Sequence, residues 1–304
     1  MPSPTRALIT GATGFVGTLL AKRFKQPVVL SRNAEKAKAH LGDVDARTWD
    51  AASAIAPGTF DGVDVVFHLA GDSVADGRWT DEKRARIRDS RVIGTRRVVE
   101  AIGASPERTR PLVLVAASAV GYYGDRGDEV LAEDAAPGDD FLAGVCVAWE
   151  KEALAAREHG VRVVTARIGI VLGDSGGALG KMLPPFRLGV GGPLGSGKQY
   201  MPWIHVDDVI GLLEHAFTKD AVDGAMNTTA PEPVTNRDFT RALGRALHRP
   251  AVLPVPAIAL KLALGDFSSA VLASQRAVPS VALRTGYRFA HSDLDVALRQ
   301  AVGG

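Results

Sequence analysis

The chain has 304 residues, of which 46% are apolar and 23% charged, so it can bury a sizeable core and is neither a collagen, a disulfide scaffold nor a disordered tail. Its 36 Lys and Arg against 34 Asp and Glu leave a formal net charge of +2, which gives no electrostatic reason to expect a nucleic acid or a membrane as partner. The one cysteine, Cys146, and a start without the apolar segment of a signal peptide predict a cytoplasmic protein.

Short apolar runs rich in β-branched residues alternate with helix-length segments through the first half of the chain. They are Ala7 to Thr10, Val28 to Leu30, Val63 to Leu69, Leu112 to Ala116 and Val161 to Ala166. Such runs are typical of buried parallel strands with crossover helices. The pattern predicts the α/β class: a Rossmann-type doubly wound parallel sheet over residues 1–168, with a return segment at about 203–217. Residues 169–304 are expected to form a smaller substrate lobe and C-terminal small domain.

Three glycines, each three residues from the next, follow the first predicted strand. Gly11 permits a tight turn, Gly14 lets the backbone approach a pyrophosphate, and Gly17 lets the helix pack closely on the sheet. Helix amides beginning near Thr13 then face the negative charge. The alternative is a glycine-rich turn without function, but its position between strand and helix favours a dinucleotide site.

The end of the second predicted strand indicates which dinucleotide. NAD sites usually carry an Asp or Glu there for the ribose 2′-hydroxyl, whereas this strand ends in Ser31 and Arg32. A hydroxyl and a guanidinium suit a 2′-phosphate. The sequence therefore favours NADP(H), unless Arg32 is merely an exposed loop charge.

Several motifs resemble the extended (atypical) short-chain dehydrogenase/reductase superfamily of NAD(P)-dependent epimerases and dehydratases. They are Thr10 to Gly17, His68 to Gly71, Arg91 to Arg96 and Trp203 to Asp208. More narrowly, the segments Ser118 to Gly124, Ala148 to Glu150, Arg167 to Gly173, Pro185 to Gly197 and Gln275 to Phe289 are similar to the epimerase-family group that includes human SDR family 39U. The resemblance covers nearly the whole chain.

The resemblance implies an NADP-binding Rossmann domain with a small substrate lobe. The positions that it and the glycine motif assign to the cofactor are Gly11, Thr13, Gly14, Phe15, Val16, Gly17, Ser31, Arg32, Leu69, Ala70, Gly71, Arg96 and Arg167. Arg96 and Arg167 can equally be ordinary ion-pair residues. The resemblance also implies a small-molecule substrate, and extended dehydrogenases often pair through helices as homodimers.

The catalytic residues depart from the family's pattern. A standard member uses a Tyr as acid and base with a Lys four residues later, but no Tyr in this sequence has a Lys at that spacing. The register of the helix before Arg167 puts Leu142 and Cys146 at these places. Ser118 stands where the family's active-site Ser is expected, unless it only caps a turn. Tyr122 is the candidate for the missing phenol, although a Tyr in a Gly-Tyr-Tyr-Gly turn can also be a packing residue.

The sequence also contains a possible nucleophile and a group of possible metal ligands. Cys146 lies among apolar neighbours, so a buried structural thiol is favoured over a nucleophile. His205, Asp207 and Asp208 are metal-ligand types, but no other His or Cys stands at ligand spacing. We therefore expect no metal, an Asp capping the following helix, and His205 in the loop or against the core.

Two further segments, one rich in glycine and one rich in arginine, are candidates for binding phosphate groups. The loop Gly191 to Gly197 with Lys198 is either a phosphate cradle for a substrate or a glycine-rich hairpin. The arginines between Arg84 and Arg97 are balanced by acidic residues, which favours a solvated helix face over nucleic-acid binding.

Two functions remain. The first is an NADP(H)-dependent oxidoreductase or epimerase-like enzyme acting on a small polar substrate, with Ser118 orienting the reacting oxygen and Tyr122 or a water giving the proton. The second is an NADP-binding regulatory or scaffold protein that has lost the chemistry, which the missing Tyr and Lys pair favours.

Overall fold

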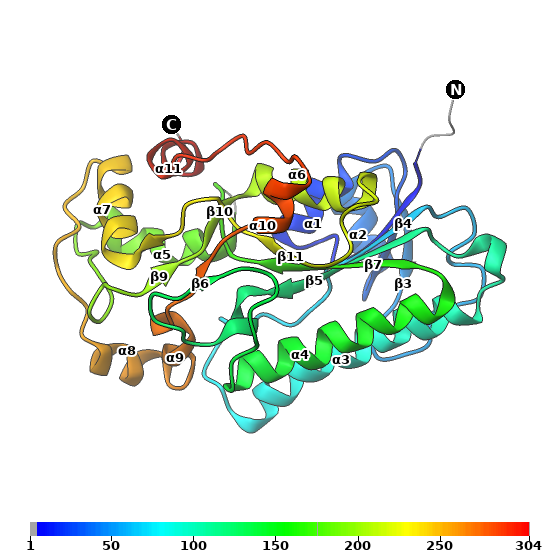
Figure 1. Cartoon of the computed structure of the whole chain (residues 1–304), viewed down its shortest axis with the longest axis horizontal. Helices are drawn as coiled ribbons and strands as arrows, with labels where there is room; N and C mark the ends of the chain where they lie inside the picture. The colour runs from blue at the N-terminus through cyan, green and yellow to red at the C-terminus, as the bar shows by residue number, and fades with distance from the viewer. Residues whose placement is uncertain (1–4, 175, 304) are drawn as a thin grey trace.

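The computed structural model describes residues 5–174 and 176–303, and its centre is a seven-stranded parallel sheet of order β11-β7-β5-β4-β1-β2-β3 (Figure 1). The strands of this sheet are β1 (Ala7–Thr10), β2 (Val28–Ser31), β3 (Asp45–Thr48), β4 (Val65–His68), β5 (Val113–Ala119), β7 (Arg162–Ile168) and β11 (Gly224–Thr228). The five predicted strands and the Rossmann-type α/β class are confirmed. β3 and β11, the two edge strands, were not predicted.

Helices cover both faces of the sheet. One face carries α1 (Phe15–Ala21), α2 (Ala34–Leu41), α6 (Val206–Thr218) and α10 (Ser280–Arg284), and the other carries α3 (Asp81–Ala104) and α4 (Phe141–Leu154) (Figure 1). Alternate residues of each strand feed the two cores: Ile9 packs with the first group of helices and Leu8 with the second.

The remaining elements form a lobe that begins where the chain leaves the carboxyl ends of β7 and β11. Two short pairs, β8 (Ile170–Leu172) with β10 (Trp203–His205) and β9 (Tyr200–Met201) with β12 (Val234–Thr235), lie beside α5 (Gly177–Arg187), α7 (Asn236–Ala246) and α11 (Leu294–Ala301). Trp203, Phe239 and Leu298 belong to their common core. The return segment predicted at 203–217 therefore contributes α6 to the sheet's cover, while its strand pairs with β8 and the main sheet takes β11 as its seventh strand.

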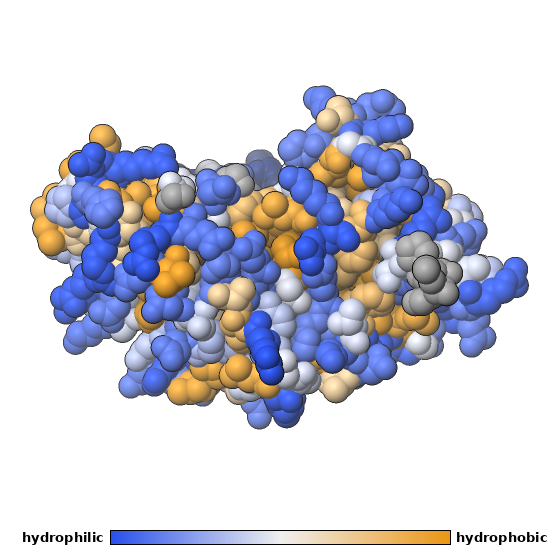
Figure 2. All heavy atoms as spheres, turned by 90° about the horizontal axis from the view of Figure 1, so that it is seen from above, coloured by the Kyte–Doolittle hydropathy of each residue, from blue (hydrophilic) through white to orange (hydrophobic). Residues whose placement is uncertain are grey.

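The other elements of the described chain are short. They are β6 (Val130–Leu131), which pairs in parallel with β13 (Arg276–Ala277), the helices α8 (Ala257–Leu264) and α9 (Phe267–Leu272), and the 3-10 turns η1 (Glu107–Thr109), η2 (Val120–Tyr123) and η3 (Ala155–His159). Seen from the side of α6 and α10, polar residues cover most of the surface and apolar residues show in patches between them (Figure 2). Within the described ranges, no helix is both long and apolar enough to cross a bilayer.

Candidate functional site

A cleft of about 440 Å³ lies at the carboxyl ends of β1, β2, β3 and β4. Open parallel sheets bind ligands at this edge. The residues that line it are Gly11, Thr13, Gly14, Leu30, Ser31, Arg32, Trp49, Asp50, Ala51, Leu69, Ala70, Gly71, Asp72, Ser73, Asp76 and Ser90.

The glycine turn at the floor of this cleft has no room for side chains. Gly11 has φ +70°, and a Cβ there would lie 2.8 Å from the carbonyl carbon of Leu69. A Cβ on Gly17 would lie 2.2 Å from the carbonyl oxygen of Gly11. Both contacts are with backbone, so only glycine keeps β1, the turn and α1 this close. The turn is therefore a cradle into which a pyrophosphate can fit.

Ser31 and Arg32 stand together where β2 reaches the cleft, and Arg32 is exposed. Asp50 faces the cleft from the end of β3. Hydrogen bonds from the amides and hydroxyl of Ala52 and Ser53 lower the pKa of Asp50 to about 2, so this carboxylate is charged at neutral pH. The opening of the cleft thus offers a cation beside β2 and an anion beside β3.

The predicted cofactor residues divide into two groups. Those that line the cleft are Gly11, Thr13, Gly14, Ser31, Arg32, Leu69, Ala70 and Gly71. Phe15, Val16 and Gly17 lie just behind it in α1, and the Phe15 ring packs against Gly173 and Gly176 of the lobe. Sequence reasoning missed Trp49, Asp50, Asp72, Ser73, Asp76 and Ser90. All but Ser90 follow β3 or β4, so the rule that ligands bind beyond strand ends could have found them.

The structure does not bring Arg96 or Arg167 into this lining. Arg96 pairs with Glu152 on the outer side of α3 and α4, with 50% of its side chain exposed. Arg167 is 4% exposed and makes two hydrogen bonds of 2.8 Å to the two carboxylate oxygens of Glu150. Both arginines therefore form ion pairs in this structure, as the alternative to cofactor binding expects.

Arg167 is the centre of a buried polar network behind the carboxyl end of β5. Register places Ser118, Arg167 and Asn227 side by side across β5, β7 and β11. The Ser118 hydroxyl donates to Glu150 Oε1 at 2.6 Å. Burial by itself lowers the pKa of Arg167, but the hydrogen bonds and charge of Glu150 raise it overall, so the guanidinium stays charged. Ser118 is therefore held by Glu150 and is only 3% exposed.

Both tyrosines of η2 contact this arginine. Arg167 Nη1 donates to the Tyr123 hydroxyl at 3.0 Å, and that hydroxyl donates to Asn227 Oδ1 at 2.7 Å. Burial raises the pKa of Tyr123 to about 12. The ring of Tyr122 lies under the guanidinium, with 3.5 Å from Arg167 Cζ to the ring centroid, and its side chain is partly exposed. Of the two tyrosines, Tyr123 is therefore buried and hydrogen-bonded, and Tyr122 is the one with part of its side chain exposed.

Cys146 lies on α4 close to Ser118 and Arg91. Desolvation, with a smaller effect of Glu150, raises the pKa of its thiol to about 12. The side chain is 4% exposed. A protonated, buried thiol is a poor nucleophile, so the structural alternative is confirmed. Arg91 stacks on Trp149 and donates to the Asp72 carbonyl, which fixes the strand-end loop beside the cleft.

The start of α6 differs from expectation. His205, not an Asp, is the N-cap, and its Nδ1 accepts from the Asp207 amide at 3.3 Å. Asp208 is fully buried and binds the segment from Tyr287 to His291. Burial and the nearby His291 ring lower the pKa of His205. Sequence spacing missed His291, which the fold brings to within 3.1 Å of Asp207.

The glycine loop is a packing element of the lobe. A Cβ on Gly192 would lie 1.7 Å from the Leu253 carbonyl oxygen, and Leu194 forms a parallel bridge with Val255. These contacts explain its glycine content without a ligand. In α3 the exposed Arg88 and Arg96 and the half-buried Arg84 and Arg97 form ion pairs, as the solvated-face interpretation predicts. Their partners are Asp89, Glu152, Asp266 and Glu100, respectively.

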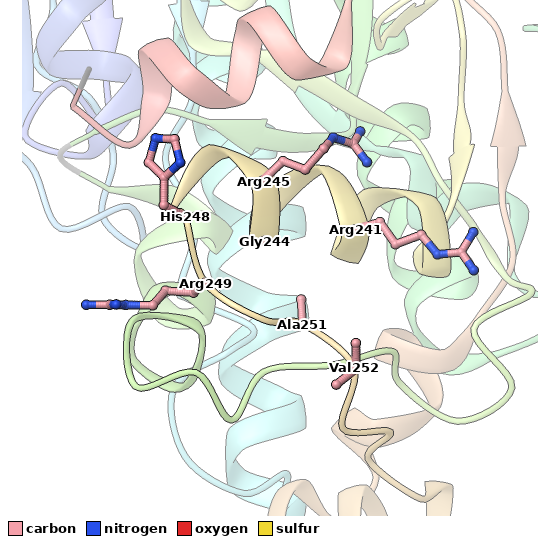
Figure 3. A pocket seen from close by; sticks show the side chains of 7 residues that line it. All are labelled: Arg241, Gly244, Arg245, His248, Arg249, Ala251 and Val252. Carbon is pink, nitrogen blue, oxygen red and sulfur yellow. The ribbon is translucent and has the colours of Figure 1, made fainter.

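A shallow hollow beside the end of α7 is lined by four basic residues, Arg241, Arg245, His248 and Arg249. Figure 3 shows His248 and Arg249 pointing away from Arg241 and Arg245. Arg245 is already held by Asp295 at 2.7 Å. The four groups do not converge on one point, so the cleft at the sheet edge is the better candidate for a charged ligand.

Comparison with known proteins covers almost the whole chain. Residues 7–228 match the model of the NAD dependent epimerase/dehydratase family, and residues 255–301 match a domain of unknown function (DUF1731). An Arabidopsis thaliana protein named epimerase family protein SDR39U1 homolog, chloroplastic, is 41% identical over 96% of this chain and 85% of its own length. An epimerase family protein of Mycobacterium bovis is 39% identical over 96% of both chains.

A solved structure is also similar. The crystal structure of human epimerase family protein SDR39U1 (isoform 2) with NADPH superposes with a TM-score of 0.86 and 34% identity, over 98% of this chain and 99% of the human one. The likeness extends through the lobe as well as the sheet.

Proposed function

Since the chain belongs to the NAD dependent epimerase/dehydratase family, we propose that it is an NADP(H)-dependent oxidoreductase or epimerase-like enzyme acting on a small polar substrate. The observation that carries the proposal is the cleft, where the glycine cradle lies at one end of β1 and Ser31 and Arg32 lie at the end of β2. The related human protein was solved with NADPH.

In this proposal the glycine turn binds the pyrophosphate, and Ser31 and Arg32 bind the 2′-phosphate. Leu69, Ala70 and Gly71 carry the cofactor toward the end of β5, where Ser118 and Tyr122 lie. When bound, NADPH supplies a hydride for a carbonyl carbon of the substrate. Arg96 and Arg167, which the sequence prediction assigned to the cofactor, are not proposed to bind it, because both are held in ion pairs away from the lining.

Tyr122 is proposed as the proton donor to the carbonyl oxygen, since it is the accessible phenol beside the strand end. Ser118 and Arg167 act as positioning residues: Glu150 holds both, and the guanidinium holds the Tyr122 ring at 3.5 Å. Because the Ser118 proton is donated to Glu150, Ser118 can orient a substrate oxygen only if that bond is broken. This arrangement stands where other family members use a Tyr with a Lys four residues later.

The cofactor assignment is tested at Arg32. Replacing Arg32 by alanine is expected to weaken NADPH binding by about 10- to 150-fold, because a hydrogen bond to a charged group contributes about 1.5–3 kcal/mol, and to leave NADH binding nearly unchanged. Lys38→Ala on α2 removes the same charge outside the cleft and should change neither constant. Dissociation constants from nucleotide fluorescence measure both. Tighter binding of NADH than of NADPH by the unaltered protein contradicts the assignment.

Turnover separates an enzyme from a regulator. We expect NADPH oxidation with at least one member of a panel of sugars, nucleotide sugars, quinones and carbonyl compounds. Tyr122→Phe should lower kcat by about 100-fold or more, the usual contribution of a general acid, without changing NADPH affinity. Tyr200→Phe, beside Arg276 in the lobe, is the matched control. Tight NADPH binding with no turnover on any panel member supports the regulatory alternative, which the missing Lys favours.

A further inference from the structure

Three metal-ligating side chains from distant parts of the sequence meet at the start of α6. Asp207 Oδ2 lies 3.4 Å from His205 Nδ1 and 3.1 Å from His291 Nε2. One ligand atom from each residue can be chosen so that all three lie within 4.8 Å of one another. We propose that His205, Asp207 and His291 bind one divalent transition-metal ion of the Zn²⁺ type, outside the nucleotide cleft.

The distances from Asp207 to the two histidines suit a shared ion. With Zn–N and Zn–O bonds of about 2.0–2.2 Å, neighbouring ligand atoms stand about 3.3–3.6 Å apart, and the two His to Asp distances are close to this range. Two imidazoles and one carboxylate form a donor set that zinc uses when it keeps one position open. The same set also binds Co²⁺ and Ni²⁺, which can serve as probes.

Hydrogen bonds hold the two imidazoles only weakly. His205 Nδ1 accepts from the Asp207 amide at 3.3 Å, a long bond that an ion at Nδ1 would replace. His291 has one polar contact, with Asp207, while its buried Nδ1 has no partner among the described residues.

The ligands are held in place before any ion binds. Asp208, which is fully buried, accepts hydrogen bonds from the Tyr287 hydroxyl at 3.0 Å and from the amides of Ala290 and His291 at 2.8 and 2.9 Å. These bonds fix the backbone of His291 against α6. His205 directly precedes the same helix, and its side chain is buried. Preorganised ligands lose little freedom on binding, which favours affinity.

One side of the cluster is open. The Asp207 side chain is 55% exposed, whereas those of His205 and His291 are 4% and 11% exposed. An ion can therefore enter past Asp207 and complete its coordination with water. Because His291 belongs to the C-terminal segment, a bound ion ties that segment to α6 and is expected to stabilise the folded chain.

The proposal is tested with the full chain after removal of metal by a chelator. Titration with Co²⁺ is expected to give one equivalent bound, with visible absorption bands of tetrahedral cobalt, and Zn²⁺ is expected to raise the melting temperature. Asp207→Asn and His291→Gln should each weaken Co²⁺ binding by 100-fold or more. His248→Gln, at an exposed position on the end of α7, is the matched control and should bind as the unaltered protein does.

Asp207→Asn keeps the shape of an exposed side chain, so it remains informative if His291→Gln does not fold. Circular dichroism of the metal-free variants and their NADPH affinity report the fold separately from the ion. Absence of a stoichiometric site, or Co²⁺ binding of equal strength in Asp207→Asn and the unaltered chain, overturns the proposal.

Discussion

Replacing Arg167 by leucine is expected to lower the free energy of unfolding by about 3–5 kcal/mol, the usual effect of breaking a buried ion pair. The change leaves the Glu150 carboxylate, which is 7% exposed, without its two hydrogen bonds from the guanidinium. It also removes the donor to the Tyr123 hydroxyl and the support under the Tyr122 ring. Urea denaturation followed by circular dichroism measures the loss.

Two control variants separate the effect of an unpaired buried charge from the effect of losing an arginine. The double variant Glu150→Leu and Arg167→Leu should recover much of the loss, since an apolar pair leaves no buried charge unpaired. Arg96→Leu, which breaks the exposed pair with Glu152, should cost less than about 1 kcal/mol and leave NADPH affinity unchanged. A large loss of NADPH affinity in Arg96→Leu would restore the cofactor role that the sequence resemblance implied.

Gly17→Ala is expected to weaken NADPH binding by more than 100-fold. The added Cβ would lie 2.2 Å from the Gly11 carbonyl oxygen and 2.7 Å from Ala12 Cα. Since both neighbours are backbone, the start of α1 and the turn must separate, and the cradle loses its shape. Overpacking of this kind also costs about 1–3 kcal/mol of stability. Calorimetric titration with NADPH and urea denaturation measure the two effects.

Gly144→Ala is the matched control for this change. Gly144 is exposed within α4, and a Cβ there meets nothing within 4 Å. Alanine should therefore raise stability by about 0.5–1 kcal/mol and leave NADPH binding intact. If Gly17→Ala binds NADPH as well as Gly144→Ala does, the glycine turn is not the nucleotide cradle.

The sequence predicted the strands that the sheet buries on both faces, because such strands are continuous apolar runs. It did not predict β3 or β11. β3 is Asp-Ala-Arg-Thr, a polar edge strand, and in β11 only Ala225 and Met226 are apolar. Such segments become strands through pairing with a neighbour, here β2 and β7, and not through a local pattern.

The sequence predicted those parts of the candidate site whose residues are neighbours in the chain. The glycine turn and the pair Ser31 and Arg32 are contiguous in sequence, and both line the cleft. The partners of Ser118 and His205 are not local: Glu150 comes from α4, and His291 is more than 80 residues from His205. Only the packing of α4 on β5 and of the C-terminal segment on α6 brings these groups together, and no spacing rule contains that information.

The C-terminal segment has a consequence for how the chain is made. Several polar groups of the earlier part form hydrogen bonds with it: the Asn227 carboxamide donates to the Val278 carbonyl, Glu133 accepts from the Val281 amide, and Asp208 accepts from the His291 amide. Segments leave the ribosome in sequence order, so residues 278–291 emerge after every strand of the main sheet. The sheet can assemble first, and its hydrogen bonds with residues 278–291 form afterwards. The growing chain is therefore expected to be more open to proteolysis until this segment packs against the sheet.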